Sequence, residues 1–196
     1  MASEIGKRID EIITLDLGPR LKVAGYRKRG RTFHAASPDH VKVVNVQASR
    51  WNEGNTGSFT VNLGVFFPEV ATLSEARPLR GPPKEYHCTV RQRLGLLMHD
   101  GKDIWWRIDS TTVSEVLARK VGTAWSVFAR PWLERVSDLS GAHAELVSQK
   151  MCFRAAMISL LLRRPSEASE LLREAERRRP HAASKIRDWG RRHDLL

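Results

Sequence analysis

VKVVNVQASRW (Val41–Trp51) and FTVNLGVFF (Phe59–Phe67) are the two stretches that decide the fold of this 196-residue chain. Both are rich in β-branched and aromatic residues, and the segment NEGNTGS between them has the Gly and Asn content of a hairpin loop. Side chains alternate between the two faces of a strand, so the apolar residues of the predicted hairpin gather on one face and form a core. This core face consists of Val44, Val46, Ala48, Phe59, Val61, Leu63, Val65 and Phe67.

The opposite face of the same hairpin carries amides, hydroxyls and an indole, and it is the predicted binding surface. Two later segments add arginines and a second tryptophan to this face if their strands pair in the expected register. The candidate binding residues are Asn45, Gln47, Ser49, Trp51, Thr60, Asn62, Arg91, Arg93, Trp105 and Arg107.

The sequence leaves three interpretations of this face open. Tryptophans with arginine neighbours on a sheet are typical of platforms for single-stranded nucleic acid. Tryptophan and arginine are also the usual anchors of protein–protein contacts. In the third interpretation, helices cover both faces of the sheet and the amides satisfy buried backbone groups.

Helices are predicted before and after the strands in the chain. Apolar residues at helical spacing indicate an amphipathic helix over residues 3–17 and a long helix over 111–136, capped by Thr112 and Glu115. Gly18-Pro19 either bends the first helix or starts a further helical turn through Leu21–Ala24. Further strands are predicted at 29–34, 85–94 and 103–109, with a turn at 99–102 and a Pro-rich loop at 68–84. The predicted fold is therefore α+β: an antiparallel sheet of four to five strands, with an N-terminal helix and a long helix packed on it.

We expect two parts, an α+β domain over residues 1–138 and a basic helical C-terminal extension over residues 139–196. An Asp-Leu-Ser-Gly segment separates them by interrupting the apolar pattern. The small residues and the proline of the extension match one tetratricopeptide-type helical pair, which cannot bury its apolar face alone and must pack on the main domain or a partner. Three helices are predicted there, at 142–163, 166–178 and 181–192.

The chain has a net charge of +11, and the charge is concentrated in its C-terminal part. Residues 150–196 contain twelve Lys or Arg against six Asp or Glu, whereas residues 41–149 carry a net charge of only +2. A basic extension attracts polyanions such as nucleic acid through screened electrostatics, but it is also a common form of solvated helical surface. Nucleic acid is therefore kept as an alternative partner of this extension.

The sequence argues against a membrane protein and against a bound metal or cofactor. No apolar segment approaches the roughly 20 residues that cross a bilayer, and the N-terminus has no signal-peptide hydrophobic region, so we expect a cytoplasmic protein with no membrane partner. Cys88 and Cys152 are expected to be buried, reduced thiols. The seven histidines show no zinc-ligand spacing with these cysteines, so neither a metal nor a cofactor is predicted.

No catalytic motif is recognisable in the sequence. Phosphate-binding glycine loops, the Gly-x-Ser-x-Gly nucleophile elbow and the His-Glu-x-x-His zinc motif are all missing from it. His87 and Cys88 are adjacent, but neighbouring strand residues point to opposite faces and cannot act together as base and nucleophile. An enzyme of unrecognised type is an unsupported alternative, and no catalytic residue is assigned.

An ordered set of segments in this chain resembles a known family. The segments GKRIDEIITLDLGPRLKVAGYRKRGRTF, VVNVQASRW, SFTVNLGVFFPEV, CTVRQRLG, DIWWRID and PWLERVSD follow one another within residues 4–138. This set is similar to the domain of unknown function 4304 family, a group of bacterial proteins. The resemblance implies the order helix, antiparallel strands, helix, and a bacterial intracellular setting, but it implies no catalytic or binding residue.

From these observations we predict a non-enzymatic protein-binding or accessory module, of which an immunity-type protein is one version. The alternative is a nucleic-acid-binding protein that uses its basic extension and the Arg/Trp face of the sheet. A platform on the sheet requires Trp51 and Trp105 to be accessible, so burial of both under a helix would exclude it.

Overall fold

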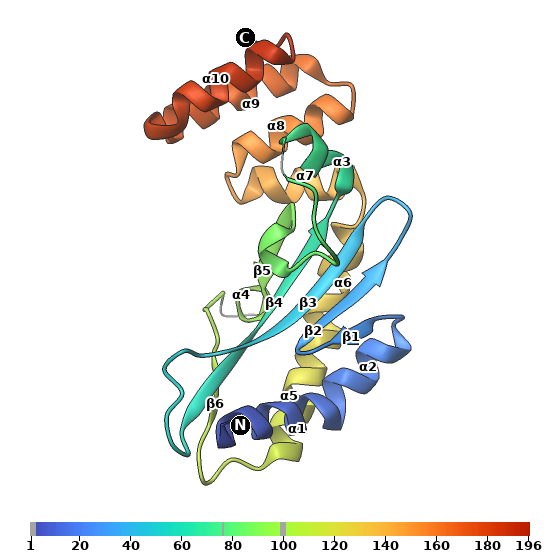
Figure 1. Cartoon of the computed structure of the whole chain (residues 1–196), viewed down its shortest axis with the longest axis vertical. Coiled ribbons are helices and arrows are strands. Elements are labelled where there is room, and N and C mark those ends of the chain that lie inside the picture. Colours follow the sequence, from blue (N-terminus) through green and yellow to red (C-terminus); the bar gives the residue numbers. More distant parts are fainter. Residues whose placement is uncertain (1–2, 76, 99–100) are drawn as a thin grey trace. The chain divides into compact units, whose positions relative to one another are not determined.

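The computed structural model describes residues 3–75, 77–98 and 101–196, which divide into two compact units. Unit 1 comprises the chain up to Phe67 together with Leu79–Glu134, and unit 2 comprises Pro68–Pro78 together with Arg135–Leu196. Unit 1 contains the sheet, and every described element of unit 2 is a helix (Figure 1). Among the described residues, no helix has both the length and the apolar character needed to cross a membrane.

Among the described residues, six antiparallel strands form the sheet of unit 1, in the order β1-β2-β3-β4-β5, with β6 paired to β4. β4 is the longest strand, and one of its edges is shared, because β5 pairs with Asn62–Val65 and β6 pairs with Gly57–Phe59. The predicted α+β class is therefore confirmed, with more strands than expected. The strands are β1 (Arg27–Arg29), β2 (Thr32–Ala36), β3 (Val41–Ala48), β4 (Gly57–Phe66), β5 (Val90–Arg93) and β6 (Trp106–Ile108).

Two long helical segments pack on one face of this sheet, and each contains a π-helical turn directly before a residue–proline pair. In η1 the Gly18 N–H bonds to the Ile13 carbonyl, ahead of Pro19, and in η3 the Arg130 N–H bonds to the Trp125 carbonyl, ahead of Pro131. A proline inside a helix lacks an N–H and crowds the carbonyl of the preceding turn, so a wider turn accommodates it. The segments are α1 (Glu4–Ile12), η1 (Ile13–Leu17) and α2 (Gly18–Val23), and α5 (Ser114–Ala124), η3 (Trp125–Ala129) and α6 (Arg130–Arg135).

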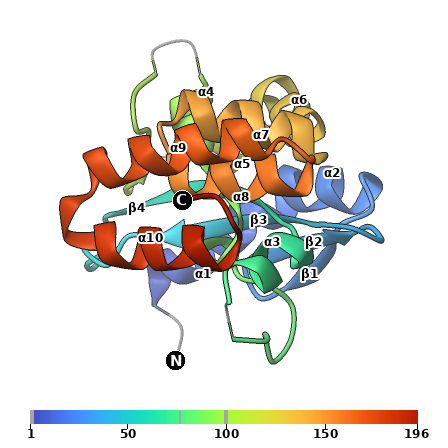
Figure 2. The same cartoon turned by 90° about the horizontal axis from the view of Figure 1, so that it is seen from above.

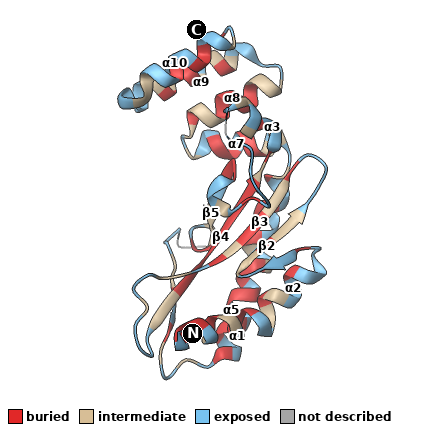
Figure 3. Ribbon diagram, in the orientation of Figure 1, coloured by how far each residue is buried: buried red, intermediate tan, exposed pale blue. Residues whose placement is uncertain are grey.

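The core of unit 1 lies between these helices and the apolar face of the sheet, and β4 is buried along most of its length (Figure 3). Trp106 of β6 stacks on Phe59 with ring centroids 5.6 Å apart, and Tyr26 meets the ring of Trp125 edge-on, also at 5.6 Å. Burial of such aromatic side chains is a large stabilising contribution. The β3–β4 register confirms the predicted core face by pairing Val44 with Leu63, Val46 with Val61 and Ala48 with Phe59.

Several local predictions were wrong. The stretch 29–34 is not one strand but parts of the β1–β2 hairpin, because Gly30 adopts a left-handed φ of 61° and reverses the chain. The Pro-rich segment 68–84 contains a helix, α3 (Pro68–Leu73). Thr112 does not cap α5, since its hydroxyl accepts the Asp109 backbone N–H and Val113 holds the N-cap position.

The segment 85–94 is only partly a strand. It begins with a 3₁₀ turn, η2 (Glu85–His87), continues as β5, and leads into the short helix α4 (Leu94–Leu97). Two residues of the predicted turn at 99–102, His99 and Asp100, lie outside the described residues.

Unit 2 is built from helices that share an apolar interior. Trp189 of α10 is 3% exposed, its ring meets Phe153 of α8 edge-on, and its indole N–H donates to the Leu73 carbonyl of α3 at 2.9 Å. The predicted helix 142–163 is in fact two, separated where Lys150 takes a left-handed φ of 58°. Figure 2 shows α9 and α10 side by side. The helices are α7 (Leu139–Ser148), α8 (Cys152–Leu161), α9 (Pro165–Arg178), η4 (Pro180–Ala182) and α10 (Ala183–Arg192).

Candidate binding face of the sheet

The face of the sheet opposite the core brings together the side chains singled out in the sequence. Directly paired residues of antiparallel strands share a face. We call this surface the polar face; it comprises Asn45, Gln47, Ser49, Trp51, Thr60, Asn62, Arg91, Arg93, Trp105 and Arg107. The pairs that place its members together are Asn45–Asn62, Gln47–Thr60, Asn62–Arg93, Gly64–Arg91 and Ser58–Arg107.

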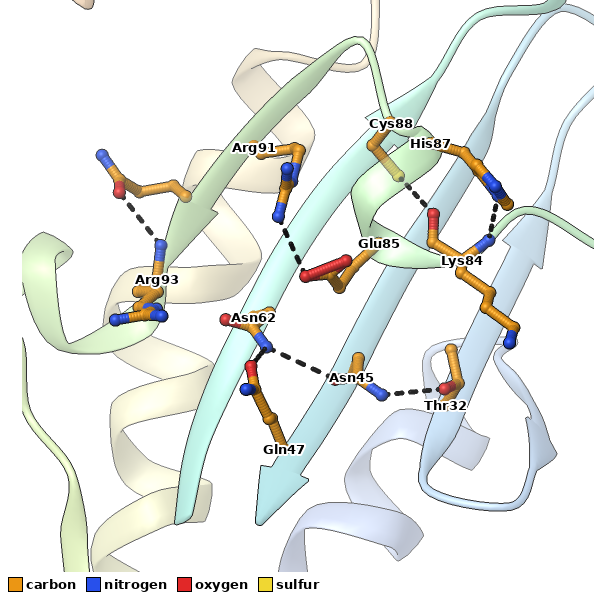
Figure 4. Close-up of polar contacts among 11 residues, drawn as sticks. Thr32, Asn45, Gln47, Asn62, Lys84, Glu85, His87, Cys88, Arg91 and Arg93 are labelled. Carbon is orange, nitrogen blue, oxygen red and sulfur yellow. Dashed lines mark hydrogen bonds and ion pairs between the residues drawn. The ribbon is translucent and has the colours of Figure 1, made fainter. Parts of the chain in front are cut away.

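A continuous hydrogen-bond network crosses three strands of the polar face (Figure 4). The Asn62 amide donates to Gln47 Oε1 at 2.8 Å and to Asn45 Oδ1 at 3.3 Å, and the Asn45 amide donates to Thr32 Oγ1 at 2.9 Å. Asn62 is only 6% exposed, whereas Gln47 is exposed. The network therefore satisfies a buried amide and orients Gln47 at the surface.

The end of the polar face around Gly64 is covered by the segment that precedes β5. There the His34 ring nitrogen Nε2 lies 2.8 Å from the Pro83 carbonyl oxygen, and the fully buried Cys88 packs against Gly64. A Cβ at position 64 would lie 2.6 Å from the Cβ of Cys88, so this close contact requires glycine at position 64. Cys88 is one of two free, buried cysteines, the other being Cys152, as predicted.

Two arginines of the polar face are held by acidic neighbours. Arg91 Nη2 lies 2.9 Å from Glu85 Oε1, and Arg93 forms an ion pair with Asp103. The Arg93 guanidinium also lies over the ring of Trp105, with its Cζ 5.4 Å from the ring centroid. These contacts fix the arginines and occupy one side of the Trp105 indole.

The open end of the polar face is dominated by Trp51, which is 78% exposed. It stands on the β3–β4 loop, which is ordered because the Asn52 side chain exchanges two hydrogen bonds with the Ser58 backbone, at 2.8 and 3.1 Å. The Arg50 guanidinium lies over the indole, 4.7 Å from the ring centroid. A large apolar side chain is thus presented to solvent by an ordered loop.

Trp51 lines two neighbouring hollows, which we call the tryptophan hollows. Each has a volume of about 600 Å³ and is open to solvent. The first is lined by Gln47, Ala48, Ser49, Arg50, Trp51, Ser58 and Trp105, and the second shares Ser49, Trp51 and Ser58 and adds Arg107 and Asp109 among others. Within the described chain, Arg50 and Arg107 have no acidic group at ion-pair distance, in contrast to Arg91 and Arg93.

The polar face is therefore divided between supporting and surface residues. Thr60 is fully buried and donates its hydroxyl to the Ile104 carbonyl at 3.2 Å, so Thr60 and Asn62 support the surface from beneath. Trp51, Gln47, Arg91 and Arg107 are exposed, and Asn45, Ser49, Arg93 and Trp105 are half-buried.

Sequence reasoning missed four residues that complete this site. Thr32 ends the amide network, Arg50 covers Trp51, and Glu85 and Asp103 neutralise arginines. Arg50 could have been found from its position next to Trp51. The other three come from segments whose pairing the local pattern does not specify.

A second polar cluster lies inside unit 2. Ser159 Oγ is 2.8 Å from His143 Nε2 and donates to Glu167 Oε2 at 3.2 Å. Ser159 is fully buried, and Glu167 approaches the same ring nitrogen as the serine, at 3.6 Å, rather than the other one. This differs from a nucleophile–base–acid arrangement, in which the acid orients the second nitrogen, so the cluster ties α7, α8 and α9 together.

Comparison with known proteins bears on unit 1. A model of the family described as Domain of unknown function (DUF4304) matches residues 17–135. A search of the curated proteins and one of the solved structures each found no match. The family match spans more than half of the 196 residues and includes every described strand of the sheet. The chain therefore belongs to the DUF4304 family.

Proposed function

We propose that the protein is a non-enzymatic protein-binding module whose contact surface is the open end of the polar face, centred on Trp51. The observation that carries the proposal is the 78% exposure of Trp51 on an ordered loop. Exposure of so large an apolar side chain to water is unfavourable, and a partner that covers it gains that free energy. An accessory or immunity-type role, in which the module binds and blocks another protein, is one form of this function.

The composition around Trp51 supports a protein partner. Tryptophan and arginine dominate the binding energy of many protein interfaces, and here Trp51 and Trp105 lie with Arg50 and Arg107 around the tryptophan hollows. Hydroxyl and amide groups surround these anchors, as in the polar rim of a protein interface. The ordered loop reduces the entropy lost when a partner binds.

The one carboxylate of the hollows with a shifted pKa supports binding rather than acid–base chemistry. Hydrogen bonds from the Thr111 hydroxyl and backbone N–H, and from the Thr112 hydroxyl, hold the pKa of Asp109 below its usual value. A general acid or base is most efficient when its pKa lies near the operating pH, and the shift at Asp109 goes the other way. Asp109 thus has the chemistry of a turn-forming residue.

Stacking of nucleic-acid bases on this face is the competing function. It requires free aromatic planes. The Arg93 guanidinium already lies over the Trp105 ring, which leaves Trp51 as the more accessible plane. A labelled single-stranded oligonucleotide that binds at physiological salt, and is released by Trp51→Ala, would favour this alternative over a protein partner.

Site-specific photocrosslinking tests the proposal directly. A benzophenone amino acid is placed at position 51, and at Val23 as a control, because Val23 is 91% exposed in the same unit. We expect a crosslinked protein of one defined mass from position 51 and none from position 23. Identical patterns at both positions, or crosslinks from position 51 to nucleic acid alone, would contradict the proposal.

A further inference from the structure

Unit 2 carries a surface of a different character at the end of α9 and along α10. The sequence RRRPHAASKIRDWGRR (177–192) contains seven Lys or Arg and a single acidic residue, Asp188. This positive charge lies outside the polar face described above.

Only part of this charge is neutralised within the protein. Glu174 pairs with both Arg177 and Arg178, and Glu75 pairs with Arg192 at 3.0 Å. Lys185, Arg187 and Arg191 are exposed, and no acidic group of the described chain comes within ion-pair distance of them. These three cations of α10 are free to bind an anionic partner.

The opposite side of α10 is used internally. Ile186 and Trp189 are 2% and 3% exposed, and Trp189 contacts Phe153 and the Leu73 carbonyl. Residues four apart lie on one face of a helix, so Arg187 and Arg191 form adjacent positions of an outward basic face. The helix has ten residues and is therefore about 15 Å long.

We infer that α10 binds the phosphate backbone of duplex nucleic acid through Arg187 and Arg191. Arginine recognises phosphate oxygens through its planar, multiply donating guanidinium. The net charge of +11 adds long-range attraction to a polyanion.

The structure disfavours other polyanionic surfaces. A helix that lies on a membrane inserts its apolar face, whereas the apolar face of α10 is buried inside unit 2. Single-stranded nucleic acid is held by exposed aromatic side chains, but Trp189 is buried. A protein interface is anchored by apolar or aromatic side chains as well as arginine, and the large apolar side chains of α10 itself, Ile186 and Trp189, are buried.

The test is fluorescence anisotropy of the full chain with a labelled duplex of about 25 base pairs, at about 50 and 150 mM salt. Arg187→Glu/Arg191→Glu is compared with Arg119→Glu/Lys120→Glu, a matched control with the same change of net charge on the exposed side of α5. We expect the α10 variant to bind the duplex about tenfold or more weakly. The slope of log affinity against log salt concentration should become shallower by about two units. The α5 control should stay within about twofold of the unaltered protein.

Three results would overturn the inference. Equal losses in both variants would mean that net charge alone attracts the duplex. Absence of duplex binding at the lower salt would exclude the site, and binding to vesicles containing phosphatidylserine without duplex binding would assign α10 to a membrane surface. Trp51→Ala should leave duplex binding unchanged, so this site and the proposed protein-binding site can fail independently.

Discussion

The two faces of the sheet in unit 1 are made by the same strands but follow different chemistry. On the core face, Phe59, Val61 and Leu63 are fully buried. On the polar face, Asn45, Gln47 and Asn62 are joined by hydrogen bonds, and exposure rises from the buried Asn62 to the solvent-facing Trp51. Because successive side chains of a strand point to opposite faces, one set of residues can stabilise the core while the alternate set is available for recognition.

The comparison also shows why an indole alone does not indicate a function. Trp106 and Trp105 are neighbours in sequence, yet Trp106 stacks on Phe59 in the core while Trp105 lines a tryptophan hollow beneath Arg93. Trp106 contributes to the stability of the core, whereas Trp105 is part of the polar face. The free energy of unfolding should therefore respond strongly to changes on one face and weakly to changes on the other.

The largest effect is expected on the core face. Phe59→Ala removes a fully buried ring that stacks on Trp106, and it should lower the free energy of unfolding by about 3–5 kcal/mol because of lost burial and a residual cavity. Urea denaturation followed by tryptophan fluorescence measures this. If Phe59→Ala lowers the free energy of unfolding no more than Trp51→Ala does, the core face does not contribute more to stability than the polar face.

A smaller effect is expected from the supporting layer of the polar face. Asn62→Ala removes the donor that Gln47 and Asn45 share, and should lower the free energy of unfolding by about 1–2 kcal/mol. Arg107→Ala is the control, since Arg107 is an exposed residue of the same face outside the amide network and its loss should change the free energy by about 0.5 kcal/mol or less. Equal effects of both substitutions in urea denaturation would argue against a supporting role for Asn62.

An effect confined to alkaline pH is expected at Tyr26, whose ring packs on Trp125. Burial, reinforced by the negative charge of Glu134, raises the pKa of Tyr26 above its usual value. The folded state therefore favours the neutral phenol, and stability falls as pH rises above the unfolded pKa of about 10. Between about pH 9 and pH 11, the free energy of unfolding of Tyr26→Phe should fall less than that of the unaltered protein, and near neutrality the two should differ little. Urea denaturation at a series of pH values measures this.

The smallest effect on stability is expected at Trp51. Because the side chain is 78% exposed, Trp51→Ala should change the free energy of unfolding by less than about 0.5 kcal/mol. Once the partner has been identified by crosslinking from position 51, the Trp51→Ala protein should no longer capture it in a pull-down. Unfolding and capture measured on the same preparation separate the two roles, and a variant that unfolds easily would show that Trp51 serves stability instead.

Much of the sheet could be predicted because its signals are local. The alternation in β3 and β4 separates the core face from the polar face, and the same alternation places Trp106 inward and Arg107 outward. Gly30 and Lys150 show where local reasoning was insufficient, since each turns the chain within a stretch that otherwise resembles one continuous element. The helix α3 was missed because its Pro-rich surroundings indicated a loop.

By itself, the sequence determined the α+β class, the two chemically distinct faces of the hairpin and the concentration of positive charge near the C-terminus, because these depend on composition and on short-range periodicity. Only the tertiary structure decided which polar residues are accessible. Cys88 can cover Gly64, Arg93 can meet Asp103 and Thr32 can complete the amide network only once distant segments pair. Long-range pairing therefore decides which residues support the polar face and which remain free to bind, since burial depends on neighbours that the local pattern does not specify.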